Sequence, residues 1–535
     1  MPVEEDRMKR YIYLLVIPVV LAGSQWVRVS GGDGYDCISS LVATTDGYAV
    51  AGRTSSFGAG VWDVLLCRFD EAGHILWTRC LGGPYSDYGL SVATTSDGEF
   101  TVVGQTTSFG TGAWDIILSR FNAWGDHLWT KTLGGQDYDI GWIILGLEDD
   151  GVLVGGQTWG YGMGGADMIL SRLNASGNHL WSRVLGWNGS DGLKQLIRTS
   201  DGGFALAGTT DSYSGNPDMI VCRLDSLGNP LWATVVGDTA VFHYQNGDSA
   251  IVLENDYGLG LVQTPDGGFV IVGYISNSHT YTNNIAIWRF DQLGRYQWTK
   301  LLKGPGSGEA RSVSLAPEGG FVVTSQTTGY GAGSKDIILS RFDASGQHIY
   351  SSVVGGAGAD TAPVLVLTPD NGFLVAAQSE SFGEGYMDIL LSRFDSQGNT
   401  CIGESVYPSV AWRKPYVTDT IPLSSSITPT MTSANPTLAS PMLEDTLICP
   451  TTIAEYAREP GTSLTVFNNT VRFILSEPGH IRLSVYDPAG RLVARPVDEG
   501  MDAGRHEVIV QLAPGVYFLE LAAGDGILRT KALVR

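Results

Sequence analysis

The feature that most constrains the fold of this chain is a segment that recurs about every 52 residues. "TTSFGTGAWDIILSRFN" at residues 106–122 returns with small changes as "RTSSFGAGVWDVLLCRFD", "TTGYGAGSKDIILSRFD" and "SESFGEGYMDILLSRFD". One marker of the repeat is an aromatic residue that begins a strand-like run, at Trp26, Trp77, Trp129, Trp181, Trp232, Trp298 and Tyr350. A second marker is an arginine near the end of another run, at Arg68, Arg120, Arg172, Arg223, Arg289, Arg341 and Arg393. Both markers occur seven times, so the sequence predicts seven copies of one structural unit.

Each unit contains four strand-like runs. In the second unit these are "YGLSVATT", "FTVVGQTT", "WDIILSRF" and "HLWTKTLG", separated by the turn "SDG" and by glycine-rich loops. Four antiparallel strands in about 50 residues, with regular glycine and aromatic markers, are typical of a β-propeller blade. A single blade would expose both of its apolar faces, so the units are expected to stack in a ring. An open solenoid of the same units is the alternative.

The two ends of the repeat indicate how the ring closes. The run "WVRVSGG" at the start of the array has the character of a fourth strand, whereas the last unit has only three good strands. We therefore expect Trp26–Gly31 to supply the outer strand of the last unit, which leaves no free edge at the seam. The expected fold class is all-β, with a seven-bladed β-propeller over residues 25–401.

Three further segments flank the propeller region. Residues 1–24 have two basic residues, an apolar run and then small residues, which predicts a secretory signal peptide. No later run is long enough for a membrane span, so no transmembrane segment is expected in the mature chain. Residues 402–460 are rich in Pro, Ser and Thr and are expected to be an extended linker with little core. Residues 461–535 resume short alternating runs between turns, which predicts a small immunoglobulin-like β-sandwich.

Residues 463–535 carry a series of blocks that resembles a known family. "FILSEPGHIRLSVYDPAGRLV", "AGRHEV", "LAPGVYFLEL" and "KALVR" are similar to the type A C-terminal sorting domain of type IX secretion cargo. The resemblance implies that residues 461–535 engage the type IX secretion machinery of a Gram-negative bacterium of the Bacteroidetes type. It also implies that the protein is secreted or held at the outer-membrane surface. Residues 26–401 resemble the glycine-rich propeller repeats of secreted bacterial proteins, which implies a fold but no activity.

Charge and cysteine content limit the partners and cofactors. The net charge of −22 at pH 7 would repel nucleic-acid phosphates, so no nucleic acid is expected as a partner. The six cysteines show no metal-binding spacing, and Cys401 with Cys449 is a conceivable disulfide. No cofactor and no metal site is predicted, although the repeated carboxylates would suit Ca²⁺.

Repeated polar residues fall on two rims of the expected ring. On one rim, the turn between the first and second strands carries an acid in every unit, and an ion pair between this acid and the repeated arginine is expected. The opposite rim, which we call the acidic rim, carries acids at the starts of the first and third strands. The third-strand set, interpreted as structural, is Asp63, Asp115, Asp167, Asp218, Asp336 and Asp388. The first-strand set is Asp36, Asp87, Asp139, Asp191, Asp256, Glu309 and Asp360.

Aromatic residues in the loops of the acidic rim are candidate ligand contacts. They are Phe57, Phe109, Tyr161, Tyr213, Tyr330 and Phe382. Three interpretations of this rim remain open: loop-bonding carboxylates with aromatics packed between blades, a binding face for sugars or Ca²⁺, and catalysis by paired carboxylates as in glycoside hydrolysis. The structural interpretation is favoured because the same residues recur in every unit, whereas a catalytic site needs only a few.

The fifth unit breaks the repeat with an insertion after Gly237. It carries further candidate ligand contacts, namely His243, Tyr244, Asp248 and Glu254, and long loops on a rigid scaffold are frequent functional sites. The sequence therefore predicts an exported, non-catalytic propeller protein that binds a glycan or a protein partner. The alternative is a secreted polysaccharide-degrading enzyme, a glycoside hydrolase or lyase, that uses carboxylates of the acidic rim. No residue is singled out as catalytic.

Overall fold

The structure is a computed structural model that describes residues 25–243, 249–277, 280, 282–383 and 385–406 and, with short gaps, 408–449 and 463–534. The expected signal peptide, residues 1–24, lies outside the described residues. The described chain is all-β and divides into two compact units, Met1–Pro450 and Thr451–Arg535. Its described residues include no helix with the length and apolar character of a membrane span.

The described residues between Val27 and Phe394 form repeated four-stranded antiparallel sheets, in which most strands that follow one another in the chain lie side by side. The strands are β1 (Val27–Gly31), β2 (Asp36–Thr44), β3 (Gly47–Thr54), β4 (Asp63–Asp70), β5 (Ile75–Gly82), β6 (Asp87–Thr94), β7 (Phe100–Thr106), β8 (Asp115–Phe121), β9 (His127–Gly134), β10 (Asp139–Gly146), β11 (Val152–Thr158), β12 (Asp167–Leu173), β13 (His179–Gly186), β14 (Asp191–Arg198), β15 (Phe204–Thr210), β16 (Asp218–Leu224), β17 (Pro230–His243), β18 (Ser249–Gln263), β19 (Phe269–Asn277), β20 (Thr282–Phe290), β21 (Tyr296–Lys303), β22 (Gly308–Leu315), β23 (Phe321–Thr327), β24 (Asp336–Phe342), β25 (His348–Val354), β26 (Asp360–Leu367), β27 (Phe373–Ser379) and β28 (Asp388–Phe394).

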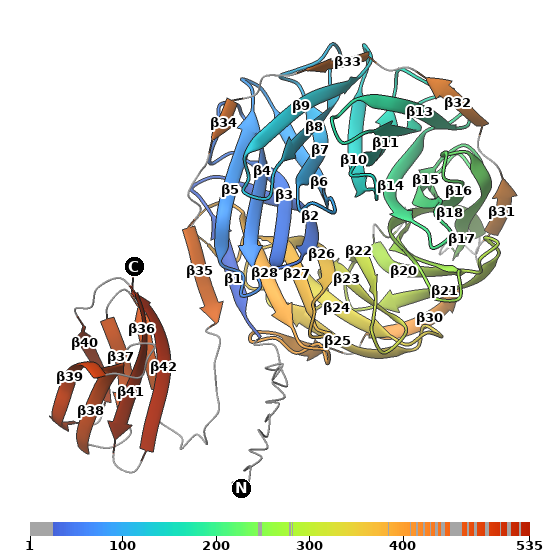
Figure 1. Ribbon diagram of the computed structural model, residues 1–535. Helices are drawn as coiled ribbons and strands as arrows, with labels where there is room; N and C mark the ends of the chain where they lie inside the picture. Colours follow the sequence, from blue (N-terminus) through green and yellow to red (C-terminus); the bar gives the residue numbers. More distant parts are fainter. Residues whose placement is uncertain are drawn as a thin grey trace, which may run out of the picture. The chain divides into compact units, whose positions relative to one another are not determined.

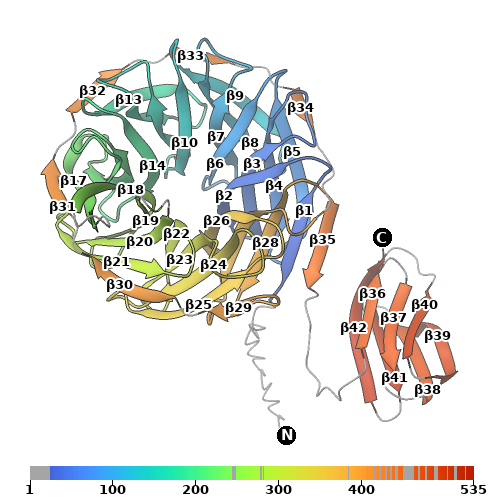
Figure 2. The same ribbon diagram turned by 180° about the vertical axis from the view of Figure 1, so that it is seen from behind.

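These sheets stand around a common centre. The four-strand units are β2–β5, β6–β9, β10–β13, β14–β17, β18–β21 and β22–β25, and β26–β28 form a further unit together with β1. The first strand of each unit lies nearest the middle and the fourth lies on the outside (Figures 1 and 2). The long strands β17 and β18 also pair with each other, which joins two units into one 10-stranded sheet.

The middle strands of each unit are buried along their length because both of their faces pack against neighbouring units. In β8, with the sequence DIILSRF, every residue is buried. Hydrophobic clusters fill the joints between adjacent units, and one of them brings Val64 and Leu66 of the first unit against Val102 and Ile117 of the second. The outer strands, such as β9, begin with exposed residues and become buried toward their ends. The core is therefore a series of layers between sheets rather than one central mass.

The seam between the last unit and the first is built like the other joints. β1 pairs antiparallel with β28, with Val27 opposite Ser392, in agreement with the expected outer strand. Trp26 packs over Gly73 of the first unit, where an added Cβ would lie 2.4 Å from the indole. The same packing of an aromatic marker over a turn glycine of the next unit recurs at Trp77–Gly125, Trp129–Gly177, Trp181–Gly228, Trp232–Gly294, Trp298–Gly346 and Tyr350–Gly398. The aromatic marker of the repeat is thus a contact between units.

The linker expected over residues 402–460 is corrected by the structure as far as residue 449. This segment forms short strands that each add to the outer edge of one unit, and it belongs to the same compact unit as the ring. The strands are β29 (Glu404–Val406), β30 (Ser409–Arg413), β31 (Tyr416–Thr420), β32 (Leu423–Ile427), β33 (Thr430–Ser433), β34 (Thr437–Ala439) and β35 (Glu444–Cys449). The physical reason is that the outer strand of a unit offers unpaired N–H and C=O groups, which an extended segment satisfies. Residues 450–462 lie outside the described residues.

The second compact unit contains two antiparallel sheets. Its strands are β36 (Ser463–Phe467), β37 (Thr470–Leu475), β38 (Gly479–Tyr486), β39 (Leu492–Met501), β40 (Gly504–Ile509), β41 (Gly515–Ala523) and β42 (Gly526–Val534). One sheet has the order β36–β37–β40 and the other β39–β38–β41–β42. The buried cluster of this unit includes Ile481, Leu483, Leu519 and Leu521 of the second sheet, with Val508 of the first sheet packed against it.

Candidate functional site

The repeated arginine joins the third strand of a unit to the turn between its first two strands. Arg68 is 4% exposed, and it donates from Nη1 to the carbonyl oxygen of Tyr48 at 2.9 Å and from Nη2 to the carboxylate of Asp46. Ion pairs of the same kind recur at Arg120–Glu99, Arg172–Asp149, Arg223–Asp201, Arg289–Asp266 and Arg393–Asp370. The expected pairing with the repeated turn acid is confirmed at Asp46, Asp201, Asp266 and Asp370. In the second unit Glu99 is the closer partner, with the turn acid Asp97 at 3.9 Å, and in the third unit the partner is Asp149 in place of the turn acid Asp150. Arg341 donates to the carbonyl oxygen of Gly319. These arginines stabilise the turns, and their guanidinium groups already donate hydrogen bonds within the scaffold.

The aspartates of the acidic rim are buried and accept hydrogen bonds from the loops above them. Every aspartate of the two sets is at most 2% exposed. Asp63 accepts from the N–H of Gly60 at 3.0 Å. Asp87 accepts from the N–H of Gly83 and from the hydroxyl of Ser108, both at 2.7 Å. These contacts agree with the structural interpretation, because the carboxylates satisfy loop donors and do not face solvent.

Burial and mutual proximity raise the pKa values of several of these carboxyls. Desolvation raises the pKa of Asp63 to about 6 and that of Asp167 to about 7, and the neighbouring charges of Asp87 and Asp191 add to the two shifts. Burial also raises the pKa of Asp218 to about 6. In each pair, one acid starts the third strand of a unit and the other starts the first strand of the next. The acidic rim therefore holds carboxyls that bind a proton close to neutral pH.

The loop aromatics singled out from the sequence pack largely against the ring. Those in contact with hydrophobic clusters between units are Phe109, Tyr161, Tyr330 and Phe382. Phe57 lies over Gly32, where an added Cβ would be 2.7 Å from its Cζ. Tyr213 is 36% exposed and packs edge to face on Trp187, with ring centroids 5.4 Å apart. These rings close joints between neighbouring loops, so most of their area is used inside the protein.

The insertion in the fifth unit is a β-hairpin formed by the ends of β17 and β18. Glu254 is 3% exposed and accepts a hydrogen bond from Nδ2 of Asn277 at 2.7 Å, so its carboxylate is engaged within the scaffold. Tyr244 and Asp248 lie outside the described residues, and the side chain of His243 is likewise not described. Among the four candidate contacts of the insertion, Glu254 is the one with a described side chain.

A row of aromatic side chains that the sequence analysis did not single out crosses the acidic rim. Ring centroids lie 5.1 Å apart for Tyr386 and Tyr35, 5.8 Å for Tyr35 and Trp62, 6.1 Å for Trp62 and Tyr88, and 5.3 Å for Tyr88 and Trp114. We call these five residues the aromatic arc. Tyr386 is 69% exposed and Tyr35 is 40% exposed. The arc spans the last, first and second units, and its other three members, Trp62, Tyr88 and Trp114, are half-buried.

The scaffold fixes the aromatic arc through neighbouring buried groups. Tyr35, Trp62 and Trp114 each stand directly before a buried aspartate of the acidic rim. The guanidinium of Arg53 lies 5.1 Å from the ring centroid of Trp62 and 4.9 Å from that of Tyr88, within the range of cation–π attraction. These two contacts of Arg53 restrict the side-chain conformations of Trp62 and Tyr88.

The aromatic arc breaks the symmetry of the ring. At the position before the third-strand acid, the other units carry Ala166, Pro217, Asn283, Lys335 and Met387 in place of Trp62 and Trp114. The aromatic arc could therefore be recognised in the sequence from the residue that precedes the recurring aspartate, which is Trp in two units and another residue type in the rest. The loop aromatics that recur from unit to unit instead pack against the scaffold.

Two cations lie on first strands, near the centre of the ring. Nζ of Lys194 is 3.8 Å from the ring centroid of Trp142, and burial together with the charge of Arg311 lowers the pKa of Lys194 to about 8. Arg311 pairs with Glu309 at 2.8 Å. Among the described residues, no group of three or more His, Cys, Asp or Glu side chains is placed to hold a metal ion.

Comparisons with known proteins give limited information. No protein-family model matches the chain. A stretch of 147 residues is 34% identical to "Regulatory protein FlaEY" of Caulobacter vibrioides. This match covers 24% of the present chain and 15% of the length of that protein.

Three solved structures with some likeness to the chain are of low identity. A fungal alcohol oxidase of the AA5 family in complex with copper is 11% identical, with 96% of this chain and 100% of that chain covered and a TM-score of 0.37. Sucrose-6-phosphate hydrolase from Lactobacillus gasseri is 9% identical, with 84% and 87% covered and a TM-score of 0.27. Endo-1,5-alpha-L-arabinanase from Thermotoga petrophila is 10% identical, with 68% and 99% covered and a TM-score of 0.23. At these values the likenesses assign no activity to the chain.

Proposed function

We propose that this chain is an exported, non-catalytic protein that binds a glycan through the aromatic arc, on a seven-bladed β-propeller. The observation that carries the proposal is the unsymmetrical row of rings from Tyr386 to Trp114 on an otherwise repeated scaffold. Tyr386 and Tyr35 are exposed, and the other three rings are half-buried. Tyr and Trp combine an apolar face with a polar edge, which suits the apolar C–H faces and hydroxyl rims of sugar rings. A row of several such rings fits an extended saccharide rather than a single sugar.

The seven-bladed form is supported by the repeat itself. Successive units pack through the same aromatic-to-glycine contact, including Trp26 on Gly73 at the seam. β1 completes the last unit by pairing with β28. A closed ring of this kind gives the aromatic arc a rigid base.

The export proposal rests on the two ends of the chain. We propose that residues 1–24 are removed as a signal peptide and that residues 461–535, with an immunoglobulin-like fold, act as a type IX sorting domain. The ordered sequence blocks of residues 463–535 and the two-sheet arrangement of the second unit support this. The protein would then be secreted or held at the outer-membrane surface of a Gram-negative bacterium.

A polysaccharide-degrading enzyme is the second candidate. The pKa of Asp167, raised to about 7, lies in the range that a general acid needs. However, Asp167 is 1% exposed and accepts the N–H of Met163 at 2.9 Å, so a substrate would have to displace the loop to reach it. The buried state of these acids favours binding over hydrolysis.

The test is a glycan array and a hydrolysis screen with the chain that follows residue 24. Tyr386→Ala and Trp62→Ala are expected to weaken binding by about tenfold or more, as for central aromatic contacts. Trp124→Ala is the matched control, because Trp124 is 78% exposed in the turn between β8 and β9, on the opposite rim. Equal loss in Trp124→Ala, or no glycan bound by the unaltered protein, would contradict the proposal.

Two further results would redirect it. Replacing residues 239–253 by Gly-Gly should leave glycan binding intact. If this variant loses binding while the arc variants keep it, the site is the inserted hairpin. Release of reducing sugar by the unaltered protein, abolished in Asp167→Asn, would establish the enzyme instead.

A further inference from the structure

The outer edges of the ring are occupied by one continuous segment of the chain. β29 pairs with β25, β30 with β21, β31 with β17, β32 with β13, β33 with β9, β34 with β5 and β35 with β1. The segment therefore visits the units in the reverse of their order in the sequence. Figures 1 and 2 show these short strands in orange on the outside of the ring. We call residues 404–449 the belt.

The register of the belt advances by seven residues from one unit to the next. Each of its later strands begins opposite one residue of an outer strand, in the pairs Ser409–Lys303, Tyr416–Gly237, Leu423–Gly186, Thr430–Gly134, Thr437–Gly82 and Glu444–Gly31. In every pair except Tyr416–Gly237 this residue is the last of its strand. The sequence carries the same period, with prolines at 408, 415, 422, 429 and 436, each directly before one of these strands. A proline has no N–H to leave unpaired, so it suits the step between two ladders.

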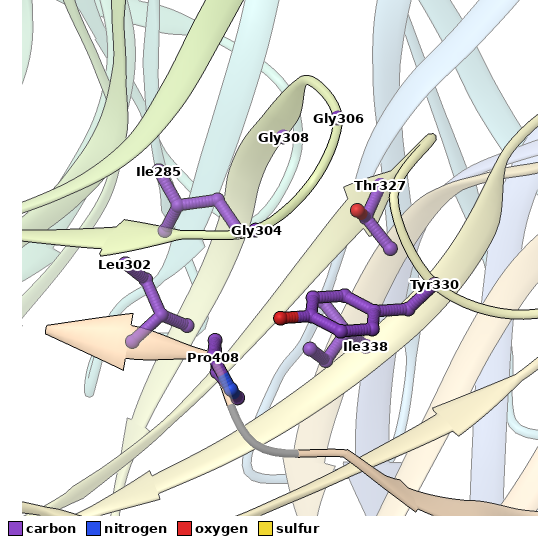
Figure 3. Close-up of a pocket in the computed structure, with 9 residues that line it drawn as sticks. All are labelled: Ile285, Leu302, Gly304, Gly306, Gly308, Thr327, Tyr330, Ile338 and Pro408. Atoms are coloured by element: carbon purple, nitrogen blue, oxygen red, sulfur yellow. The ribbon is translucent and has the colours of Figure 1, made fainter.

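Pro408 shows what such a step contacts. It is buried and lines a small pocket with Ile285 and Leu302 of one unit and Tyr330 and Ile338 of the next (Figure 3). Val406, just before it, packs on the hydrophobic cluster shared by the same two units. The belt is thus anchored at this joint by apolar contacts as well as by backbone pairing.

The two ends of the belt lie on neighbouring units, with β29 on the sixth unit and β35 on the last. β1 lies between β28 and β35, with Val27 opposite Ser392 on one side and Cys449 on the other. The chain leaves β28 and reaches Cys401 seven residues later, just before the belt begins.

Cys401 is disulfide-bonded. Among the cysteines whose side chains the structure describes, Cys37, Cys67, Cys80 and Cys222 are free and buried. The sequence holds six cysteines, so Cys449 is the one that remains as a partner within the chain.

We infer that a Cys401–Cys449 disulfide closes the belt, which encircles the ring in a seven-residue register and holds the closing strand β1 in place. The bond forms when the two thiols pass two electrons and two protons to a protein disulfide that acts as oxidant and leaves as a dithiol. The outer edges are a surface for extended strands, and their occupant is this segment of the chain. An open belt leaves those edges free to pair with a second copy.

The covalent closure is tested by labelling cysteines in the denatured full chain. Four cysteines should react with an alkylating reagent before reduction and six after it, and digestion should yield one linked peptide pair that contains Cys401 and Cys449. A Cys222→Ser variant should lower both counts by one and leave the linked pair unchanged. Six reactive cysteines before reduction, or a linkage of Cys401 to any other cysteine or chain, would overturn the closure.

The register is tested separately in a Cys401→Ser/Cys449→Ser background. Deletion of residues 416–422 removes one full period, so the rest of the belt can move along by one unit. Deletion of residues 416–418 removes fewer residues but breaks the period. Hydrogen exchange should show β9 and β13 still protected in the seven-residue deletion, with protection lost on β1. In the three-residue deletion, protection should fall on β17, β13, β9 and β5 together.

The opposite order would overturn the register. If the three-residue deletion keeps the outer strands at least as protected as the seven-residue deletion, the belt is a tether whose pairing has no fixed step. Thermal unfolding of both variants gives a second reading, since the midpoint should fall further for the shorter deletion.

Discussion

Asp63 and Asp87 form a buried carboxyl pair across the boundary between the first and second units. Asp63 begins β4 and Asp87 begins β6. Both lie close to Gly82, where an added Cβ would be 1.8 Å from Oδ1 of Asp63 and 2.9 Å from Oδ2 of Asp87. Asp167 and Asp191 repeat this arrangement around Gly186. Two negative charges so placed destabilise the folded protein, so its stability is linked to proton binding.

Asp167→Asn is predicted to remove part of this pH dependence. The pKa of Asp167 is raised to about 7, so between the ordinary aspartate pKa and pH 7 the folded state holds a proton that the unfolded state has lost. The contribution of Asp167 to the free energy of unfolding is therefore greatest at low pH. It declines as pH rises, by up to about 1.4 kcal/mol per pH unit. The variant should match the unaltered protein near pH 4 and become the more stable of the two by pH 8.

The measurement is the free energy of unfolding of both proteins in denaturant from pH 4 to pH 8. The comparison between variant and parent matters, because burial lowers the pKa values of His127, His179 and His348 and their protonation acts in the opposite direction. Asp46→Asn, at an acid on the opposite rim, serves as control. An advantage of Asp167→Asn that shrinks as pH rises would contradict the prediction.

Unequal effects are predicted for the two halves of the Arg289–Asp266 ion pair. The side chain of Arg289 is 11% exposed, pairs with Asp266 at 2.6 Å and donates to the backbone of β19, whereas the side chain of Asp266 is 67% exposed. Arg289→Met should cost roughly 2–4 kcal/mol, since buried carbonyl groups lose their donor. Asp266→Asn should cost less than about 1 kcal/mol, as for an exposed partner. Equal losses on denaturant unfolding would show that the ion pair itself, and not the backbone contacts of Arg289, is what matters.

Phe109 is predicted to stabilise the fold and not to bind a ligand. Its ring lies over Gly83 and against the cluster between the first two units. Phe109→Ala should therefore lower the free energy of unfolding by roughly 3 kcal/mol, with no change in glycan binding by the folded protein. Tyr213→Ala, at a residue 36% exposed, should cost less. A loss of binding in Phe109→Ala at full stability would return the loop aromatics to the candidate site.

Much of the ring could be predicted because each unit repeats the same short sequence patterns for strands and turns. The alternation around "DIILSRF", the turn acids and Trp26 at the start of the array indicated four-strand units and the pairing of β1 with β28. The belt was missed because its strands depend on edges that the ring provides, and its composition alone favours an unpaired chain. The seven-residue spacing of its prolines was the available signal.

The candidate site was harder to predict for a related reason. A repeat makes shared residues conspicuous, and the shared aromatics, such as Phe109 and Tyr330, turned out to pack between units. The aromatic arc consists of residues that differ from unit to unit, and their proximity arises only when the ring brings Tyr386 of the last unit beside Tyr35 of the first. Because Tyr35 and Tyr386 are far apart in the sequence, their contact can be predicted only once the ring is known to close between the last and first units.

Closure at the seam can be tested at Gly73. Its φ is +77°, and an added Cβ would lie 2.4 Å from Trp26 and 2.9 Å from Arg28. Gly202 has a φ of +86° in another tight turn, but an added Cβ there meets nothing within 4 Å. Both Gly→Ala variants suffer the backbone strain, of about 1 kcal/mol. Gly73→Ala must in addition displace Trp26, so it should lose roughly 2–4 kcal/mol in total.

Limited proteolysis gives the second reading of the same pair of variants. Because Trp26 precedes β1, Gly73→Ala should expose residues 25–31 to cleavage at protease concentrations that leave the parent and Gly202→Ala intact. The effect should be local at first, since β26–β28 keep their own pairing when β1 is released. If Gly73→Ala and Gly202→Ala are equally stable and equally resistant, Trp26 does not hold the first unit to the last. The ring would then be closed by the ladders of β1 with β28 and β35 and by the other buried residues that join the last unit to the first.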